Sequence, residues 1–134
     1  MLLVVEPDGS VPIYQQIRDR IVEAIAAGEQ PAGSPLPATR QLGVDLGINF
    51  HTVNKAYDML RREGLVRLNR KSGAVIARDA SGTPASVEFA VEWGGRLHTL
   101  LAEAAAQGMS ADQIVDATRA VIAGFPLVRR EEET

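Results

Sequence analysis

The stretch Pro37–Arg62, PATRQLGVDLGINFHTVNKAYDMLRR, predicts two short helices joined by a tight turn at residues 47–49. In the first helix, Leu42 and Leu46 lie one helical turn apart, which gives that helix an apolar side. Gly43, between them, is small enough to let another helix approach closely. The stretch therefore predicts two packed helices connected by almost no loop.

The turn contains residues that end one helix and begin the next. Gly47 enters the left-handed region without strain at Cβ, and Asn49 is a suitable N-cap that we expect to accept from the backbone N–H of Thr52. The second helix has one apolar stripe and one polar face, as helix-turn-helix DNA binding requires, although a plain helical hairpin has the same pattern. The stripe is Val53, Ala56, Tyr57 and Leu60, and the opposite face carries Phe50, His51, Asn54, Lys55 and Asp58.

The residues that follow make the DNA-binding interpretation more specific. Residues 64–68 predict a short strand, residues 69–73 a basic turn, and residues 74–77 a returning strand. Helix, turn, helix and then a hairpin with a basic tip is the element order of a winged helix.

The residues before this stretch predict another core helix. Ser10 and Pro12 supply a cap and an early-turn proline for a helix that ends near Ala27, with isoleucines at every fourth position. Residues 1–9 predict an extended lead-in, which could form an edge strand. The proline-rich residues 30–37 predict a connecting loop.

Charge is distributed unevenly along the chain. Residues 10–78 hold ten Lys or Arg against six Asp or Glu, a balance of +4, whereas residues 79–134 hold four against nine, a balance of −5. Residues 1–9 add −2, which gives the net −3. A basic half joined to an acidic half is expected of a nucleic-acid-binding domain with an appended domain.

Composition excludes several classes of protein. The chain has no cysteine, so it has no disulfide and no thiolate metal site. The apolar run at the N-terminus is too short for a secretory signal, and no stretch approaches the ~20 apolar residues that span a bilayer. We expect a soluble, cytoplasmic protein with no membrane partner.

The second half predicts a linker and two helices. Residues 79–86 have the composition of a linker, a helical pattern covers residues 87–107, and Ser110 and Gln113 form a capping box for a final helix. Two short helices cannot bury their apolar stripes on each other, so we expect a second copy of the chain to cover them; packing back on the winged helix is the alternative. Trp93 suits either an interface or a core. The predicted dimerisation residues are Trp93, Leu97, Leu100, Leu101, Ile114, Val115, Thr118, Val121 and Ile122.

Residues 11–78 resemble the N-terminal winged-helix domain of the GntR family of bacterial transcription regulators. They follow its pattern PxYxQIxxxIxxxIxxGxxxxGxxLPxxRxLAxxLGVxxxTVxxAxxxLxxEGLVxxxxGxGxxV almost end to end. The segment INFHTVNKAY is similar to the YtrA-type subfamily, in which INPNTVxKAY is usual. The resemblance implies a homodimeric, sequence-specific regulator, more often a repressor, that binds a pseudo-palindromic operator in double-stranded DNA. The resemblance does not indicate whether a small-molecule effector binds.

Three positions depart from the family pattern. Ala38 replaces a usual Ser cap, although Thr39 could serve; Phe50 stands where many members have a base-contacting Arg and this subfamily often has Pro; and the wing RKSG keeps only Gly73 of a GxG. These departures bear on which DNA sequence is bound.

Position assigns the expected roles in DNA binding. The first turn of the second helix of the motif enters the major groove, and the basic wing lies at the minor groove. Arg40 matches the family's phosphate-contacting Arg, with a surface ion pair to Asp45 or another acid as the alternative. Phe50 would contact a thymine methyl or pack beside the turn. The predicted DNA-binding residues are Arg40, Asn49, Phe50, His51, Thr52, Asn54, Lys55, Arg70, Lys71 and Gly73.

The sequence thus predicts a mainly α fold with a small β-hairpin (α+β). A winged helix-turn-helix domain covers residues 1–78, a linker residues 79–86, and a two-helix dimerisation region with a solvated acidic tail residues 87–134. Enzyme motifs such as a glycine-rich phosphate loop, HExxH and GxSxG are missing from the sequence, and we expect no catalytic residue, metal or cofactor. A winged helix that binds a protein partner, or DNA without sequence preference, is the alternative.

Overall fold

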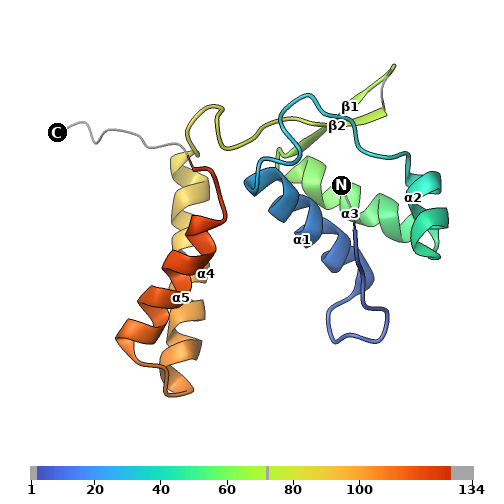
Figure 1. The fold of residues 1–134 in the computed structure, drawn as a ribbon. Coiled ribbons are helices and arrows are strands. Elements are labelled where there is room, and N and C mark those ends of the chain that lie inside the picture. The colour runs from blue at the N-terminus through green and yellow to red at the C-terminus, as the bar shows by residue number, and fades with distance from the viewer. Residues whose placement is uncertain (1–2, 72, 128–134) are drawn as a thin grey trace. The chain divides into compact units, whose positions relative to one another are not determined.

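The computed structural model describes residues 3–71 and 73–127, and these residues form five helices and one two-stranded antiparallel hairpin (Figure 1). The predicted α+β class is confirmed. In chain order the elements are α1 (Ile13–Ala26), α2 (Thr39–Leu46), α3 (Phe50–Arg62), β1 (Val66–Asn69), β2 (Gly73–Ile76), α4 (Val87–Ala106) and α5 (Ala111–Ala123).

The chain divides into two compact units, one that runs to Ser81 and also includes Pro126 and Leu127, and one that spans Gly82–Phe125. The first contains α1 to β2, and the second contains α4 and α5. The predicted acidic tail, from Val128 onward, lies outside the described residues.

The N-terminal segment is attached to α1 by a buried glutamine. The Gln16 side chain accepts from the Glu6 N–H at 2.7 Å and donates to the carbonyl oxygens of Glu6 at 2.9 Å and Val11 at 2.7 Å. The expected edge strand is not formed by residues 3–9, because this side chain takes the backbone bonds of Glu6 that a sheet partner would need. The predicted Ser10 cap is also wrong: Pro12 occupies the N-cap of α1, and no side chain caps the helix.

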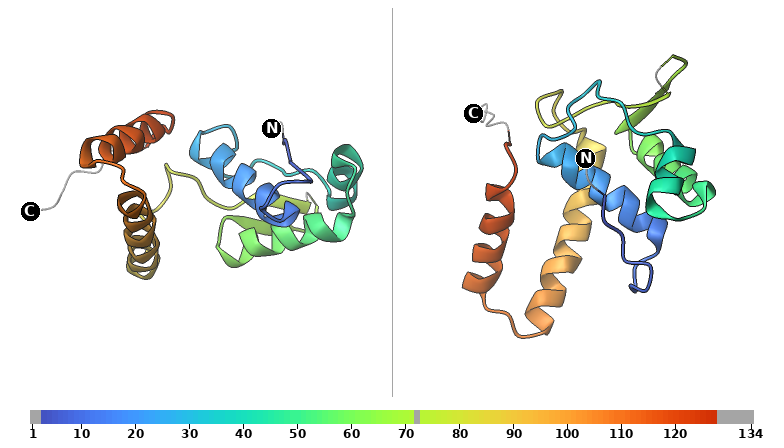
Figure 2. Two further views of the ribbon diagram at one scale, coloured as in Figure 1. Left: turned by 90° about the horizontal axis from the view of Figure 1, so that it is seen from below. Right: turned by 45° about the vertical axis from the view of Figure 1, so that its right-hand side comes forward.

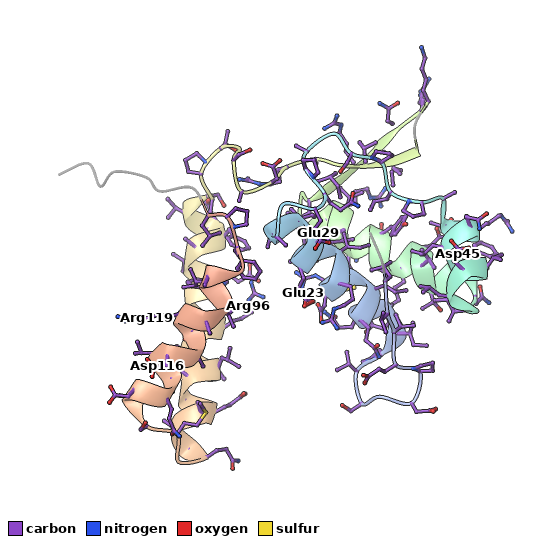
Figure 3. All side chains as sticks on the ribbon, in the orientation of Figure 1. Glu23, Glu29, Asp45, Arg96, Asp116 and Arg119 are labelled. Carbon is purple, nitrogen blue, oxygen red and sulfur yellow. The ribbon has the colours of Figure 1, made fainter. Side chains whose placement is uncertain are left out.

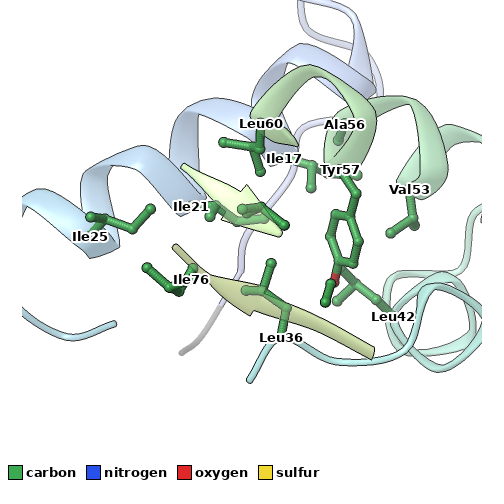
Figure 4. Close-up of a cluster of buried hydrophobic side chains, with 12 residues drawn as sticks. Ile17, Ile21, Ile25, Leu36, Leu42, Val53, Ala56, Tyr57, Leu60 and Ile76 are labelled. Atoms are coloured by element: carbon green, nitrogen blue, oxygen red, sulfur yellow. The ribbon is translucent and has the colours of Figure 1, made fainter. Parts of the chain in front are cut away.

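The core of the first unit lies between α1, α3 and the hairpin (Figure 4). Isoleucines on one side of α1 meet the apolar stripe of α3, and α2 packs on the same helix (Figure 2). The most deeply buried large side chains are Ile17, Ile21, Val53, Leu60 and Ile76. Burying this stripe on one side of α3 leaves its polar side toward solvent.

The turn between α2 and α3 depends on two glycines. Gly47 has φ 68°, in the left-handed region, as predicted for a helix end. A Cβ on Gly43 would lie 3.0 Å from the carbonyl oxygen of Ile48 and 3.3 Å from Cα of Phe50, so Gly43 permits close approach, as predicted. At the start of α2, Ala38 is the N-cap without a side-chain bond, and Thr39 lies inside the helix instead of capping it.

The hairpin is joined to the loop that precedes α2. Val66 pairs with Ile76 and Asn69 with Gly73 in the antiparallel register. On the outer side of β2, the Leu36 N–H donates to the carbonyl oxygen of Ala74 at 2.9 Å, and the Ile76 N–H donates to that of Ser34 at 2.9 Å. Residues 33–36 therefore fix the base of the hairpin.

The second unit is a hairpin of two capped helices. Ser86 accepts from the Phe89 N–H at 3.1 Å at the start of α4, which continues unbroken through Gly94 and Gly95. The predicted capping box of α5 is present, with Ser110 and Gln113 bonded to each other's backbone. Neither helix contains a buried residue, and side chains project along both (Figure 3).

Candidate nucleic-acid interface

The outer face of α3 carries the side chains predicted to contact bases. His51, Asn54 and Lys55 are exposed, whereas Thr52 is half-buried. The buried stripe on the opposite side of α3 fixes the rotation of the helix, so these polar side chains point away from the core. An exposed polar face at the first turns of such a helix suits the major groove.

Asn49 acts in the structure as the N-cap of α3. Its side-chain oxygen accepts from the His51 N–H at 2.9 Å, so the prediction that it caps Thr52 is wrong. The Thr52 N–H donates to the backbone carbonyl of Asn49 at 3.0 Å instead. The single side-chain oxygen of Asn49 thus already accepts a hydrogen bond within the helix-turn-helix, at the surface expected to meet DNA.

Arg40 and Phe50 form a stack at the turn of the motif. The guanidinium carbon of Arg40 lies 4.1 Å from the centroid of the Phe50 ring, and the Phe50 and His51 ring centroids are 4.2 Å apart with a tilt of 34°. The alternative ion pair of Arg40 with Asp45 does not form among the described residues, and Asp45 accepts from the Gln41 side chain at 2.7 Å.

Lys55 lies against a residue that sequence reasoning did not include in the site. Its Nζ is 3.8 Å from the centroid of the Tyr14 ring on α1. The tyrosine of the PIY segment is part of the family pattern, and that was the only signal available in the sequence. In the structure, α1 thus contributes an aromatic surface beside the outer face of α3.

The acidic residue of this face is neutralised by its own helix. Asp58 is ion-paired with Arg61 and with Arg62, the latter at 2.7 Å. These two arginines are mostly exposed, and pairing limits the net positive potential that they add. Among residues 3–71 and 73–127, no ion pair involves Arg70 or Lys71, the basic side chains of the wing.

The wing presents two exposed basic side chains, Arg70 and Lys71. The Asn69 side chain accepts from the Lys71 N–H at 2.9 Å and so orders the turn. Gly73 has φ 73°, a left-handed conformation that side-chain-bearing residues rarely adopt. The glycine that the family pattern keeps here is required by the backbone.

A hollow of about 710 Å³ separates the outer face of α3 from the wing. Polar residues of α3 line one side, and the wing strands line the other, including Leu68, whose side chain is 67% exposed. Leu68 lies on the same face of β1 as the buried Val66, but it lines this hollow instead of the core. The surface thus has a polar side on α3 and an apolar side on the wing strands.

Tyr57 positions the start of α2 relative to α3. Its hydroxyl donates to the carbonyl oxygen of Pro37 at 2.8 Å, and burial raises the pKa of the phenol. The neutral, hydrogen-bonded form is therefore the one that holds the two helices together at ordinary pH.

The second unit exposes most of the residues predicted for dimerisation. Leu97 and Ile114 are half-buried, and the Thr118 hydroxyl donates to the carbonyl oxygen of Ile114 at 2.8 Å. Exposed large apolar side chains in this unit are Val87, Phe89, Val91, Trp93, Leu100, Leu101, Met109, Val115, Val121 and Ile122. Phe89 and Val91 add to the predicted set, and the alternation of apolar with acidic residues near the start of α4 was the available signal.

The described residues form neither a metal-binding cluster nor a membrane-spanning helix. Among residues 3–71 and 73–127, no group of three or more His, Cys, Asp or Glu side chains is placed to hold a metal ion. In the same part of the chain, no helix combines the length and apolar character needed to cross a membrane.

Comparison with known proteins identifies this arrangement of elements. The family model described as bacterial regulatory proteins, gntR family, matches residues 13–76. The HTH-type transcriptional repressor YtrA of Bacillus subtilis is 35% identical over 82 residues, 61% of this chain and 63% of that protein. The HTH-type transcriptional regulator Rv1152 of Mycobacterium tuberculosis is 31% identical over 91 residues, 65% of this chain and 75% of that protein.

A solved structure agrees with these relatives. YtrA from Sulfolobus acidocaldarius, a GntR-family transcription factor, superposes with a TM-score of 0.61 and 33% identity over 79% of this chain and 99% of that chain. The chain spans 63% of the length of the Bacillus relative. The chain belongs to the GntR family of bacterial regulatory proteins, and its helix-turn-helix and hairpin are the winged DNA-binding domain of a transcription regulator.

Proposed function

We propose that the protein represses transcription by binding, as a homodimer, to a pseudo-palindromic operator in double-stranded DNA. The observation that carries the proposal is the concave surface formed by the exposed face of α3 and the basic wing. In the proposed complex, α3 enters the major groove and Arg70 and Lys71 lie at the minor groove.

The proposed base contacts come from His51, Asn54 and Lys55. Asn54 is exposed near the N-terminal end of α3 and can pair bidentately with adenine. Lys55 can bind guanine or phosphate once it leaves the Tyr14 ring, and leaving that ring costs about 0.5–1 kcal/mol at an exposed site. Asn54 is therefore the residue on which sequence preference should depend most.

The proposed dimer forms through α4 and α5. Neither helix contains a buried residue, and together they expose nine large apolar side chains. A water-exposed apolar surface of this kind is normally covered by a partner, and a second copy satisfies the two-fold symmetry of a palindromic site. The repressor role is supported by the name of the Bacillus relative.

Selection from a randomised pseudo-palindromic DNA library, followed by sequencing at two salt concentrations, tests this function. We expect a motif with two half-sites, and Asn54→Ala should weaken binding by about 1–3 kcal/mol and relax preference at one base position in each half-site. Gln107→Ala, an exposed amide at the end of α4, is the matched control and should leave binding unchanged.

The other outcomes assign other functions. Binding that depends on salt but not on sequence would indicate a general DNA-coating protein, because phosphate contacts alone give that behaviour. No binding at either salt concentration would contradict the DNA-binding proposal and favour a winged helix that binds a protein.

A further inference from the structure

Phe50 stands at a position where the family pattern has other residues, and the structure gives it a specific neighbour. Its ring lies beneath the guanidinium of Arg40, 4.1 Å from ring centroid to guanidinium carbon. This is within the ~6 Å at which a guanidinium and an aromatic face attract each other. Phe50 is the first residue of α3 and is half-buried, so the ring is fixed by the turn.

No carboxylate competes for Arg40 among the described residues. Asp45, the acid weighed from the sequence as a partner for Arg40, accepts from Gln41 one turn earlier on α2, at 2.7 Å. The ion pairs formed by residues 3–71 and 73–127 do not include Arg40. An exposed arginine without such a partner would ordinarily sample many rotamers, and the Phe50 ring is the feature that selects one.

In this orientation the Arg40 guanidinium lies beside the first residues of α3. Arg40 and Phe50 line a shallow hollow of about 540 Å³ together with Gly43, Gly47 and Asn49. The Phe50 ring also contacts His51, whose ring centroid is 4.2 Å away. The ring therefore contacts both a cation and a residue of the proposed base-contacting face.

We propose that Phe50 is a positioning residue: it holds the Arg40 guanidinium in the orientation that binds a DNA phosphate. This inference rests on the proposed function and assigns separate roles to Arg40 and Phe50 within it. Arg40 supplies the charge, and Phe50 reduces the conformational freedom that Arg40 loses when it binds. Phe50 then carries no sequence information of its own, in contrast to contact with a thymine methyl.

Nuclear magnetic resonance of the free protein tests the geometry. The side-chain protons of Arg40, held over an aromatic face, should be shifted upfield, and Phe50→Leu should abolish that shift while Phe50→Tyr retains it. Thermal melting of both variants checks that the fold is kept. Arg40 protons at ordinary positions in the unmodified protein would overturn the proposal without any DNA.

The salt dependence of operator binding tests the role. The logarithm of the binding constant falls with the logarithm of salt concentration, and each phosphate contact makes this slope steeper by about 0.9. Losing one contact in each DNA-binding domain of a dimer should therefore make the slope less steep by about 1.8. Arg40→Gln should show this loss. Phe50→Leu removes no charge, yet it should also make the salt dependence less steep, whereas Phe50→Tyr should keep the steepness of the unmodified protein. The double variant Arg40→Gln/Phe50→Leu should be no less steep than Arg40→Gln alone.

Three results separate the failure of this inference from the failure of the proposed function. If the unmodified protein binds its operator and Phe50→Leu keeps the full slope, Phe50 is not a positioning residue. If Phe50→Leu keeps the slope but changes the preferred base at one position, the ring contacts a base. If the unmodified protein does not bind DNA, the proposed function fails and this inference fails with it.

Discussion

The ammonium of Lys55 lies 3.8 Å from the centroid of the Tyr14 ring and so connects α3 to α1. Tyr14→Leu should lower the free energy of unfolding by about 0.5–1 kcal/mol beyond the loss of packing, because the cation–π attraction disappears. A double-mutant cycle with Lys55→Gln in urea unfolding measures the coupling. Strictly additive effects of the two substitutions would show that the contact contributes nothing to stability.

A methyl group added at Gly43 should destabilise the first unit. Its Cβ would meet backbone atoms of Ile48 and Phe50 at 3.0–3.3 Å, and a backbone held in a tight turn gives way poorly. We expect Gly43→Ala to cost about 1–2 kcal/mol, since overpacking outweighs the gain in helix propensity.

Gly94→Ala is the matched control for that substitution. Gly94 is also helical, but a Cβ there has no neighbouring atom within 4 Å among the described residues. It should be neutral or should stabilise α4 by up to about 1 kcal/mol. Chemical denaturation of both variants distinguishes the cases, and equal effects at the two sites would contradict the role given to Gly43.

Tyr57 should make the protein sensitive to alkali. Burial raises the pKa of its phenol, so the unfolded state releases the proton first, from about pH 10, and stability falls as pH rises above that value. Tyr57→Phe should lose about 1 kcal/mol near neutral pH with the bond to Pro37 and should show a smaller decline above pH ~10. Urea midpoints at several pH values measure both effects, and a parallel decline in the variant would assign the sensitivity to another group.

Leu100→Glu should dissociate the proposed dimer. Leu100 is 61% exposed on α4, so a charge there is tolerated by the monomer but not by an apolar interface. Sedimentation should change from twice 14.4 kDa to the mass of one chain. Val44→Glu makes the same chemical change at an exposed position on α2, and it should leave the mass unchanged. A dimeric Leu100→Glu variant would place the interface elsewhere.

Local features of the sequence predicted most of the fold. The periodicity around Leu42 and Val53, the left-handed glycine Gly47 and the capping box at Ser110 act within a few residues, so they can be recognised without knowing the rest of the molecule. The incorrect predictions concern side chains that find more distant or equally suitable partners. Gln16 binds the backbone of Glu6 ten residues away and replaces the expected strand pairing.

The sequence predicted which residues lie on the candidate site better than it predicted the contacts that these residues make. Lys55 and Arg40 were expected to face DNA from their positions in the pattern, but the rings beneath them come from α1 and from the start of α3. Such contacts depend on the angle between helices and on side-chain rotamers, which the periodicity of a sequence does not specify. Asn49 shows the same limit, because several backbone N–H groups lie within reach of an N-cap side chain and the structure selects that of His51.

Residues 34–37 connect both elements of the proposed DNA-binding surface, the wing and α3. Ser34 and Leu36 hydrogen-bond to β2, and the carbonyl of Pro37, immediately afterwards, accepts from Tyr57 on α3. This four-residue segment thus links the wing to α3 through hydrogen bonds at both ends, so a movement of one element relative to the other would break these bonds. In the proposed complex, the separation between α3 in the major groove and the wing at the minor groove is therefore fixed before binding. DNA whose groove widths do not match this separation should bind more weakly, so the domain would respond to the shape of the DNA as well as to its bases.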